Sequence, residues 1–549
     1  MFKKNPASKQ LNISDPIFSF PGYVQEMLKN SWAEYFFHSI FSKINEERFN
    51  SLYSSSYSRP NAPVNILVGL LILKELNRWT DEELIAALYF DYRVRYALGI
   101  VDFDKERICI NTLGNFRKRL YQDTAENERD LLKEEIFHLT ESLIELTEMD
   151  TELARQDSMM ISANAKKMGR LELIYTVNQA VVKMLSENKA VPDALNHYLQ
   201  EKDKSNHIYR LKKEEVEERT ALLLKESFLL YDTAPEELKE KEAFKNLARL
   251  LEEQTDHLGP KDPKDIGSTS MQNPHEPEAT YRVKGKKSSV GYGLNIVEAR
   301  DLGKDLSMII HYERQPNIFS DAQFGLSAVE ELKRGTTLVS DGSYYSEAMV
   351  KKAASKNLNL SYSALSGRPT SQDKLSSTKF TINPETDLIT ACPNGAVPVS
   401  SKRNHKDEFY RAKFDKKDCA ACPHLERCIV KEQKRSYMVK ITDKQYIADY
   451  YRALLGTPLH QALGDFRAGV EGVPSVLRRV YGIDKVPVRG LTRSRIWDHG
   501  KVMAFNFRSF FEYCRKNGVS ALSSSLVFIL FKRFYRCFRL NGVTNFNYA

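Results

Sequence analysis

The sequence predicts an α/β protein in which a mixed sheet covered by helices is joined to a helical N-terminal region and two insertions. Three observations predict this class. Strand-like and helix-like segments alternate between residues 288 and 363. The first 150 residues show helical periodicity, and two stretches of unusual composition interrupt the sheet. A chain of 549 residues is too long for one simple core, so we expect about two to four domains.

Composition and charge indicate a globular protein with a polyanionic partner. Hydrophobic residues make up 42% of the chain and aromatic residues 11%, which are globular values. The net charge is +9, and from residue 461 to the end 15 Lys/Arg stand against 5 Asp/Glu. This basic segment favours nucleic acid as a partner. A solvated basic face is the alternative.

No segment predicts export or membrane insertion. The N-terminus lacks the apolar stretch of a signal peptide, and apolar runs such as residues 64–73 and 526–531 are too short to cross a bilayer. We therefore expect a soluble, cytoplasmic protein without a membrane partner. Seven cysteines without a signal peptide do not indicate a disulfide framework.

The N-terminal part is predicted to be a polar tail, residues 1–20, followed by a helical domain, residues 21–150. Residues 63–76 form an apolar helix, and Thr80 and Glu83 have capping-box spacing ahead of the next one. Another helix starts at Asn111 and carries a basic end. Short helices with a basic tip are typical of a helix-turn-helix-like DNA contact, and a plain helical bundle is the alternative. The residues of this basic end are Arg117, Lys118 and Arg119.

The sheet begins with a strand at residues 153–161 that contains Asp157. A segment dense in Glu, Lys and Leu follows at residues 170–256, which predicts a helical insertion with a scaffolding role. Residues 258–280 are rich in Pro, Gly and Asp and predict a loop. We place the insertion and this linker together at residues 170–280.

Strands and helices then alternate. Strands are expected at residues 288–297, 306–312, 336–340 and 358–363, and helices at 321–333 and 346–355. The third of these strands ends directly at Asp341 and Gly342. An acid at the carboxyl end of a strand, followed by glycine, is a common active-site placement, although an ordinary Asp-Gly turn has the same sequence.

A cysteine cluster marks a second insertion at residues 366–460. The motif Cys419-Ala-Ala-Cys422 is followed by Cys428, and Cys392 lies 27 residues before Cys419. Four thiolates from two loops suit a tetrahedral structural zinc site. His424 is a possible substitute ligand, and an iron–sulfur cluster, a redox pair or unliganded thiols are alternatives. Basic residues crowd the same stretch and suggest contact with DNA.

Near the C-terminus an isolated acid lies in a basic helical frame. At about 100° per residue, Arg467, Glu471 and Arg478 share one side of an α-helix. The acid suits a hard cation and the arginines suit phosphate oxygens. Arg479 follows directly, and Pro474 predicts a kink or a restart of the helix.

Three carboxylates on separate elements can bind two divalent cations, about 3.5–4 Å apart, that activate a water or a 3′-hydroxyl and stabilise the leaving oxygen. Magnesium suits this chemistry because it takes oxygen ligands and keeps its waters; manganese is a possible substitute. Spacing alone does not select Asp157, Asp341 and Glu471 from 72 acids. Turn capping, or pairing of Glu471 with Arg467, explains each acid singly.

The joint order of motifs resembles the DDE transposases of bacterial insertion sequences, and most closely the insertion-sequence eleven-eighty-two group. The resemblance covers about residues 15–165 and 280–510. It rests on Gln156-Asp157-Ser158, on Val339-Ser-Asp341-Gly, on the cysteine motif and on Arg467-x₃-Glu471-Gly, which continues to Val488-Arg489-Gly. The chain departs from the pattern at Gly464, where an aromatic residue is expected.

This resemblance implies an RNase H-like catalytic core, with its first part at residues 151–169 and 281–365. Its C-terminal helices and a basic tail fill residues 461–549. It implies that Asp157, Asp341 and Glu471 are the catalytic residues and ligate two Mg²⁺ ions. DNA is the expected partner, as the terminal inverted repeats of an insertion sequence and as target. The expected enzyme is a bacterial, nucleoid-associated oligomer, a homodimer or larger, that cleaves strands and transfers them. The DNA-binding residues are then Arg467, Arg478, Arg479, Arg489, Arg117, Lys118 and Arg119.

Two other functions stay open at this point. One is a non-catalytic DNA-binding relative that keeps only the helical domain and the cysteine motif. The other is an RNase H-like nuclease that never joins strands.

Overall fold

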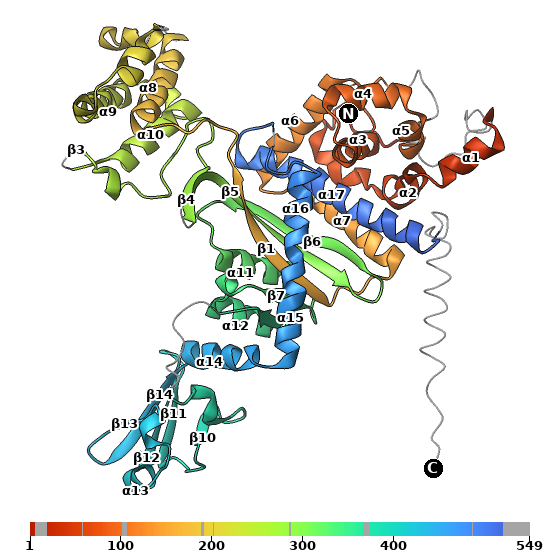
Figure 1. The fold of residues 1–549 in the computed structure, drawn as a ribbon. Helices are drawn as coiled ribbons and strands as arrows, with labels where there is room; N and C mark the ends of the chain where they lie inside the picture. The colour runs from red at the N-terminus through yellow and green to blue at the C-terminus, as the bar shows by residue number, and fades with distance from the viewer. Residues whose placement is uncertain are drawn as a thin grey trace.

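The computed structural model describes residues 1–5, 19–56, 59–100, 107–187, 191–200, 202–257, 259–284, 287–365, 373–485 and 487–519. A central sheet separates a helical N-terminal region from a cysteine-rich end, and a helical insertion projects beside the N-terminal region (Figure 1). This arrangement agrees with the predicted mixed α/β class. The predicted polar tail at residues 1–20 falls largely outside the described residues, and the basic tail does so beyond residue 519.

The central sheet is mixed and has the order β4-β5-β1-β7-β8, with β6 also paired to β5. β1 runs antiparallel to β5 and parallel to β7, and β7 runs parallel to β8. All the strands predicted here are present, with ends shifted by a few residues. Their bounds are β1 (Leu153–Ser162), β4 (Thr280–Lys284), β5 (Lys287–Asp301), β6 (Leu306–Pro316), β7 (Thr337–Ser340) and β8 (Asn359–Tyr362).

Two layers of helices cover the sheet. One face packs on α11 (Asp321–Glu331) and α12 (Glu347–Ser355), with Ala154, Phe324 and Leu338 in the shared core. The other face packs on C-terminal helices and on α7, in a core that continues into the N-terminal region. Because successive residues of a strand point to opposite faces, β1 presents its odd-numbered residues to the C-terminal helices.

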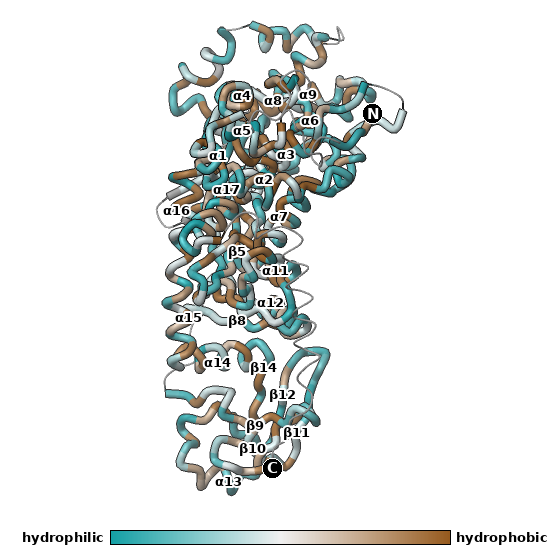
Figure 2. Tube along the Cα trace, turned by 90° about the vertical axis from the view of Figure 1, so that its right-hand side faces the viewer, coloured by the Kyte–Doolittle hydropathy of each residue, from teal (hydrophilic) through white to brown (hydrophobic). Residues whose placement is uncertain are grey.

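The N-terminal region is helical, as predicted, and the capping box is present at Thr80 and Glu83. α3 is buried along nearly all of its length, and Figure 2 shows hydrophobic segments around it. The helices are α1 (Gly22–Lys29), α2 (Trp32–Ser39), α3 (Val64–Asn77), α4 (Asp81–Phe90), α5 (Tyr92–Ala97), α6 (Ile110–Asn127) and α7 (Leu131–Thr147).

The long helix α17 (Leu491–Lys516) joins this region to the sheet. Lys501 pairs with Glu75 of α3, with both side chains at most a tenth exposed. Asp498 takes two hydrogen bonds from the guanidinium of Arg314 on β6, at 2.6 and 2.7 Å. Breaking such a buried pair costs about 3–5 kcal/mol, so α17 fixes the helical region against the sheet.

The helical insertion is a separate hydrophobic cluster built from α8 (Arg170–Glu187), α9 (Val216–Thr233) and α10 (Glu242–Gln254). Its helical character agrees with the prediction. The segment that returns to the sheet contains the short pair β2 (Thr255–Asp256) and β3 (Gly259–Pro260) and the 3₁₀ turn η9 (Pro263–Asp265).

The cysteine-rich end has a small core beneath a four-stranded antiparallel sheet of order β11-β12-β14-β13. Its strands are β9 (Thr381–Asn383), β10 (Leu388–Ala391), β11 (Ser400–Asn404), β12 (Phe409–Asp415), β13 (Lys431–Glu432) and β14 (Ser436–Thr442), with the short helix α13 (Lys416–Ala420). From β14 the chain returns through α14 (Asp443–Leu455) and α15 (Pro458–Ala468) to the central sheet (Figure 1).

The expected single helix through Arg467, Glu471 and Arg478 is wrong. α15 ends at Ala468, a 3₁₀ turn η13 spans Gly469–Glu471, and α16 spans Gly472–Arg479. A 3₁₀ turn has three residues per turn instead of 3.6, so it changes the angular relation between the residues before and after it. Pro474 lies in the first turn of α16, where its missing N–H costs no helical hydrogen bond, which agrees with the predicted restart.

Candidate active site

The three predicted acids lie on three different elements. Asp157 is in the middle of β1, Asp341 directly follows β7, and Glu471 ends η13. β1 and β7 are parallel neighbours in which Arg155 is opposite Val339. Two residues further along each strand, Asp157 and Asp341 therefore lie level with one another at the same end of the sheet.

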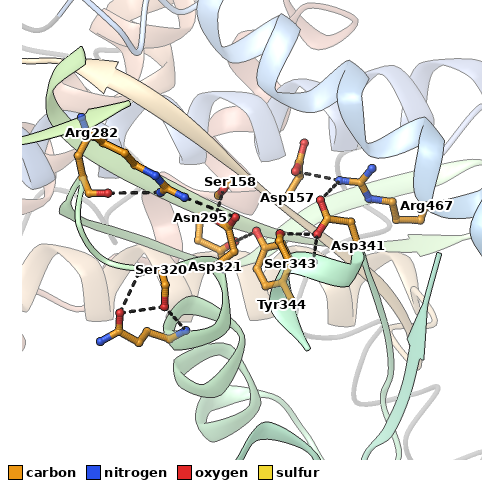
Figure 3. A network of polar contacts seen from close by, with 12 residues as sticks. Asp157, Ser158, Arg282, Asn295, Ser320, Asp321, Asp341, Ser343, Tyr344 and Arg467 are labelled. Carbon is orange, nitrogen blue, oxygen red and sulfur yellow. Dashed lines mark hydrogen bonds and ion pairs between the residues drawn. The ribbon is translucent and has the colours of Figure 1, made fainter. Parts of the chain in front are cut away.

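Arg467 holds these two aspartates together. Its Nη2 lies 2.9 Å from Oδ1 of Asp157 and 3.6 Å from Oδ2 of Asp341 (Figure 3). The Arg467 side chain is only 13% exposed. One guanidinium thus compensates two carboxylates at the position where their oxygens converge.

Glu471 approaches Asp157 from the C-terminal helices. Both residues line a cavity of about 450 Å³, and the Glu471 side chain is exposed. Asp341 does not line this cavity; it joins the group through Arg467. The other polar residues at the cavity wall are Ser158, Arg282, Ser475, Arg478 and Arg479. An acidic floor with a basic rim can bind a cation and a phosphate side by side.

Asp341 is fixed by the turn that follows it. Its Oδ1 accepts a hydrogen bond from the Ser343 backbone N–H at 2.7 Å, which is the capping role expected of an Asp-Gly turn. A side chain at Gly342 would meet the Ala364 carbonyl oxygen at 2.6 Å. The local turn therefore points Oδ2 at Arg467, so the turn and the site use the two oxygens of one carboxylate.

Arg155 anchors the segment that carries Arg467 and Glu471. Its Nε donates to Oε2 of Glu298 at 2.6 Å, and its Nη1 donates to the carbonyl oxygen of Phe466 at 2.6 Å. A Cβ on Gly469 would lie 2.5 Å from Nη1 of Arg155, so glycine permits this close approach. The sequence pattern does not single out Arg155; its position two residues before Asp157 on one face of the strand is the available signal.

The opposite face of β1 carries a second polar network (Figure 3). Ser158 donates to Asp321 at 2.7 Å. Tyr344 donates to Asn295 at 2.7 Å. Burial raises the pKa of Tyr344 well above its ordinary value, and the negative charges of Asp321, Asp157 and Asp341 add to this. Tyr344 therefore remains a protonated donor, and these hydrogen bonds tie β1 to α11 and the turn after β7 to β5.

The predicted basic residues near Glu471 are not equivalent. Arg478 donates to the Met160 carbonyl oxygen at 3.0 Å, and Arg489 donates to that of Asn164 at 3.1 Å. Both side chains remain exposed, as does Arg479. The sequence pattern does not single out Arg282 of β4, which lines the same cavity and lies 3.8 Å from Asp321.

Arg117 requires a correction. It is buried, and it makes two hydrogen bonds to Asp81, at 2.7 and 2.9 Å, beneath the ring of Trp497. Hydrogen bonding from Arg117 lowers the pKa of Asp81 to about 2. A guanidinium neutralised in this way is not placed for a phosphate, so it has a packing role. Lys118 and Arg119 are exposed, but they lie in the middle of α6 and not at the basic end that the sequence predicts.

The four predicted cysteines converge on one small cavity of about 20 Å³, which His424 also lines. Burial raises the pKa of Cys419 to about 11, and the neighbouring thiols Cys392, Cys428 and Cys422 contribute. Within the described residues, however, no three His, Cys, Asp or Glu side chains adopt a metal-binding arrangement. The structure thus shows convergence of the thiols and no preformed metal site in the part of the chain it describes.

Comparisons with known proteins identify two parts of the chain. A family model described as "Transposase DDE domain" matches residues 391–511, and "Transposase domain (DUF772)" matches residues 27–119. The first includes the cysteine motif and Glu471, and the second lies within the helical N-terminal region. Together they support a DDE transposase.

The structural comparison is weak. A chain from a cryo-EM structure of a piggyBac transposase synaptic complex with hairpin DNA is 12% identical, with 74% of this chain and 82% of that chain covered. Its TM-score of 0.20 is too low to establish a common fold. No curated protein matches the sequence. Among the described residues, no helix combines the length and apolar character needed to cross a membrane.

Proposed function

We propose that this protein is a DNA transposase of the insertion-sequence eleven-eighty-two type. It binds the terminal inverted repeats of its element, cleaves DNA strands and transfers them to a target. One observation carries the proposal: acids from three separate elements gather at one edge of the sheet. Asp157 and Asp341 share one guanidinium, and Asp157 and Glu471 share one cavity.

The strand order supports an RNase H-like core. Three antiparallel strands, β6, β5 and β1, are followed by the parallel strands β7 and β8. The first acid lies on the central strand of this order, and the second directly follows its parallel neighbour. The glutamate comes from helices that pack on the same face as Arg155.

Two Mg²⁺ ions, or Mn²⁺ in their place, would activate the attacking hydroxyl and stabilise the leaving oxygen when bound. Asp157, Asp341 and Glu471 would supply their carboxylate ligands. Arg467 compensates the two aspartates in the structure, and its guanidinium would lie beside a phosphate oxygen of a DNA strand bound at these acids.

Basic side chains at the rim of the cavity would bind further phosphate oxygens of the DNA strand. Arg282, Arg478 and Arg479 surround Glu471 with exposed or half-buried positive charge. Contacts of this kind fix the position of DNA without reading its sequence. Lys118 and Arg119 on α6 and Arg489 ahead of α17 are the other exposed basic residues that we propose for DNA. The enzyme is expected in the bacterial cytoplasm, acting at the nucleoid as a homodimer or a larger oligomer.

The proposal is tested with the single variants D157N, D341N and E471Q on a duplex that contains an element end, in Mg²⁺. Each change keeps the size of the side chain and removes its charge, so we expect cleavage to fall at least about 10³-fold. D465N is the matched control because Asp465 is an exposed acid on α15. Retained cleavage in all three variants would reject the site.

A target plasmid in the same assay separates a transposase from a nuclease. Joined products are expected from the wild-type chain. Cleavage without joining would identify a hydrolytic nuclease, and DNA binding without any Mg²⁺-dependent product would identify a non-catalytic relative.

We further propose that Cys392, Cys419, Cys422 and Cys428 hold a structural zinc ion. The support for this proposal is that four thiols border one cavity, and four cysteines can close into a tetrahedral site once their side chains rearrange around the ion. Burial raises the pKa of the Cys419 and Cys428 thiols, so a metal must displace protons from these two residues to bind. Metal analysis of freshly purified, reduced protein tests this, with about one zinc per chain expected.

A further inference from the structure

The four-stranded sheet of the cysteine-rich end has two very different faces. On the inner face, alternate residues pack into the small core, among them Ala412, Phe414, Val439 and Ile441. The intervening residues point outward because side chains alternate along a strand. Five of the outward residues are basic and exposed: Lys402, Arg411, Lys413, Lys431 and Lys440. We call these five residues the outer basic face.

The strand register places like charges opposite one another. Lys402 of β11 pairs with Arg411 of β12, and Arg411 pairs with Lys440 of β14. Three cations therefore form a row across three strands. The neighbouring row brings Lys413 and Lys431 to the two sides of Met438. Like charges directly opposite one another destabilise a sheet.

The outer basic face lacks internal compensation. None of its five side chains forms an ion pair with another of the described residues. Arg403, the next residue after Lys402, points inward and pairs with Asp443 at 2.6 Å and Asp387 at 3.1 Å. On the same strand, acids thus neutralise the inward Arg403, whereas the outward Lys402 has no acidic partner among the described residues. The only ring beneath the row is Phe409, with Lys440 Nζ at 4.0 Å among the described contacts.

The dimensions of this face suit a nucleic-acid backbone. Neighbouring strands lie about 4.8 Å apart and alternate residues of a strand about 7 Å apart. A grid of five cations on this spacing can neutralise several successive phosphates of a duplex. A single small anion would compensate only part of it, whereas a polyanion compensates all of it.

We propose that the outer basic face binds the phosphate backbone of double-stranded DNA without reading its sequence. This inference rests on the proposed function, because it takes the transposition substrate as its partner. α14 and α15 connect this sheet directly to η13 and Glu471 (Figure 1). DNA held on the outer face is therefore linked through two helices to the element that presents the third acid.

The test measures the affinity of the full chain for an end-containing duplex in EDTA, by fluorescence anisotropy over a range of salt concentrations. The triple variant K402E/R411E/K440E is compared with wild type. We expect at least about tenfold weaker binding and a log–log salt slope reduced by about 2–3, since each lost phosphate contact removes about 0.9. K402Q/R411Q/K440Q, which only neutralises the charges, should give a smaller change in the same direction.

The matched control is K183E/K213E/K225E, which makes the same change of charge on exposed lysines of the helical insertion. It should bind almost as wild type does. Equal affinity and equal salt slope for both triple variants would overturn the inference, provided that circular dichroism shows both folded. Because EDTA prevents cleavage, this outcome is independent of catalysis. A wild-type chain that binds DNA but never cuts it would instead refute the proposed function.

Discussion

The helical N-terminal region and the cysteine-rich end both carry basic clusters. An acid neutralises the buried cation in the first, whereas the cations on the outer basic face of the second have no such partner among the described residues. Arg117 in the helical region is buried against Asp81. Arg411 in the cysteine-rich end is exposed between two further cations. We expect the first cation to stabilise the fold and the second to destabilise it slightly. The comparison teaches that a basic cluster indicates a ligand only where the fold leaves it uncompensated.

The two regions also differ in what holds them together. The helical region belongs to a large core that extends through α17 into the central sheet. The cysteine-rich end has only seven buried residues in its own cluster, one of them Cys419. Small cores of this kind commonly need a metal or a disulfide. The largest difference between the regions should therefore appear when the thiols are disturbed.

Removing the proposed zinc is expected to have the largest effect. Structural zinc sites contribute about 10–16 kcal/mol in small domains, so Cys422→Ser or a strong chelator should unfold residues 373–442 locally. Hydrogen exchange would then rise there and stay unchanged in α3 and α17. Cys109→Ser is the control because Cys109 is exposed and distant in sequence from the cluster. A metal-free protein that keeps its exchange protection would contradict the zinc proposal.

Arg117→Ala is expected to have the next largest effect. It removes two charge-assisted hydrogen bonds from Asp81, which is half-buried and keeps Lys74 at 3.2 Å, so we expect a loss of about 2–3 kcal/mol. Urea unfolding should show this loss, and adding Asp81→Ala to the same chain should recover part of it. If Arg117 served DNA and not the fold, the variant would unfold like wild type and bind DNA more weakly.

The pair of Arg117 and Asp81 also predicts that the free energy of unfolding decreases at low pH, by a smaller amount. Arg117 lowers the pKa of Asp81 from 3.8 to about 2, so the carboxylate stabilises the folded state above about pH 4. This contribution is lost as the pH falls from 4 towards 2, and it amounts to about 2 kcal/mol. The difference in unfolding free energy between wild type and Asp81→Asn should shrink over this range. A difference that does not change with pH would show that the ion pair contributes no stability.

The sequence predicts the elements of the fold well because their signals are local. The capping box at Thr80 and the apolar run of α3 depend only on neighbouring residues. The acids Asp157 and Asp341 are singled out by the resemblance to DDE transposases, because a place on or after a predicted strand does not select them from 72 acids. Their meeting at Arg467 could not be predicted, because it depends on how α15 packs on β1.

Residues whose role depends on tertiary pairing were the least predictable. Arg117 belongs to a basic run in the sequence, and only the position of α4 shows that Asp81 neutralises it. Arg155 has no motif, yet it anchors the segment before Glu471. The prediction of one helix through Arg467 and Arg478 was wrong because Gly469, Gly472 and Pro474 allow a 3₁₀ turn and a new helix start.

The smallest predicted effect is on the free energy of unfolding, and it compares a cation on the outer face of β11 and β12 with a cation on their inner face. Arg411→Gln removes a cation that lies opposite Lys402 and Lys440, so the unfolding free energy should stay within about 0.5 kcal/mol or rise slightly. Arg403→Gln is the matched variant on the inner face. It breaks the pairs with Asp443 and Asp387, and should cost about 1–3 kcal/mol. Equal losses in the two variants would mean that the outer cation is compensated within the fold, which would remove the electrostatic reason for expecting DNA on that face.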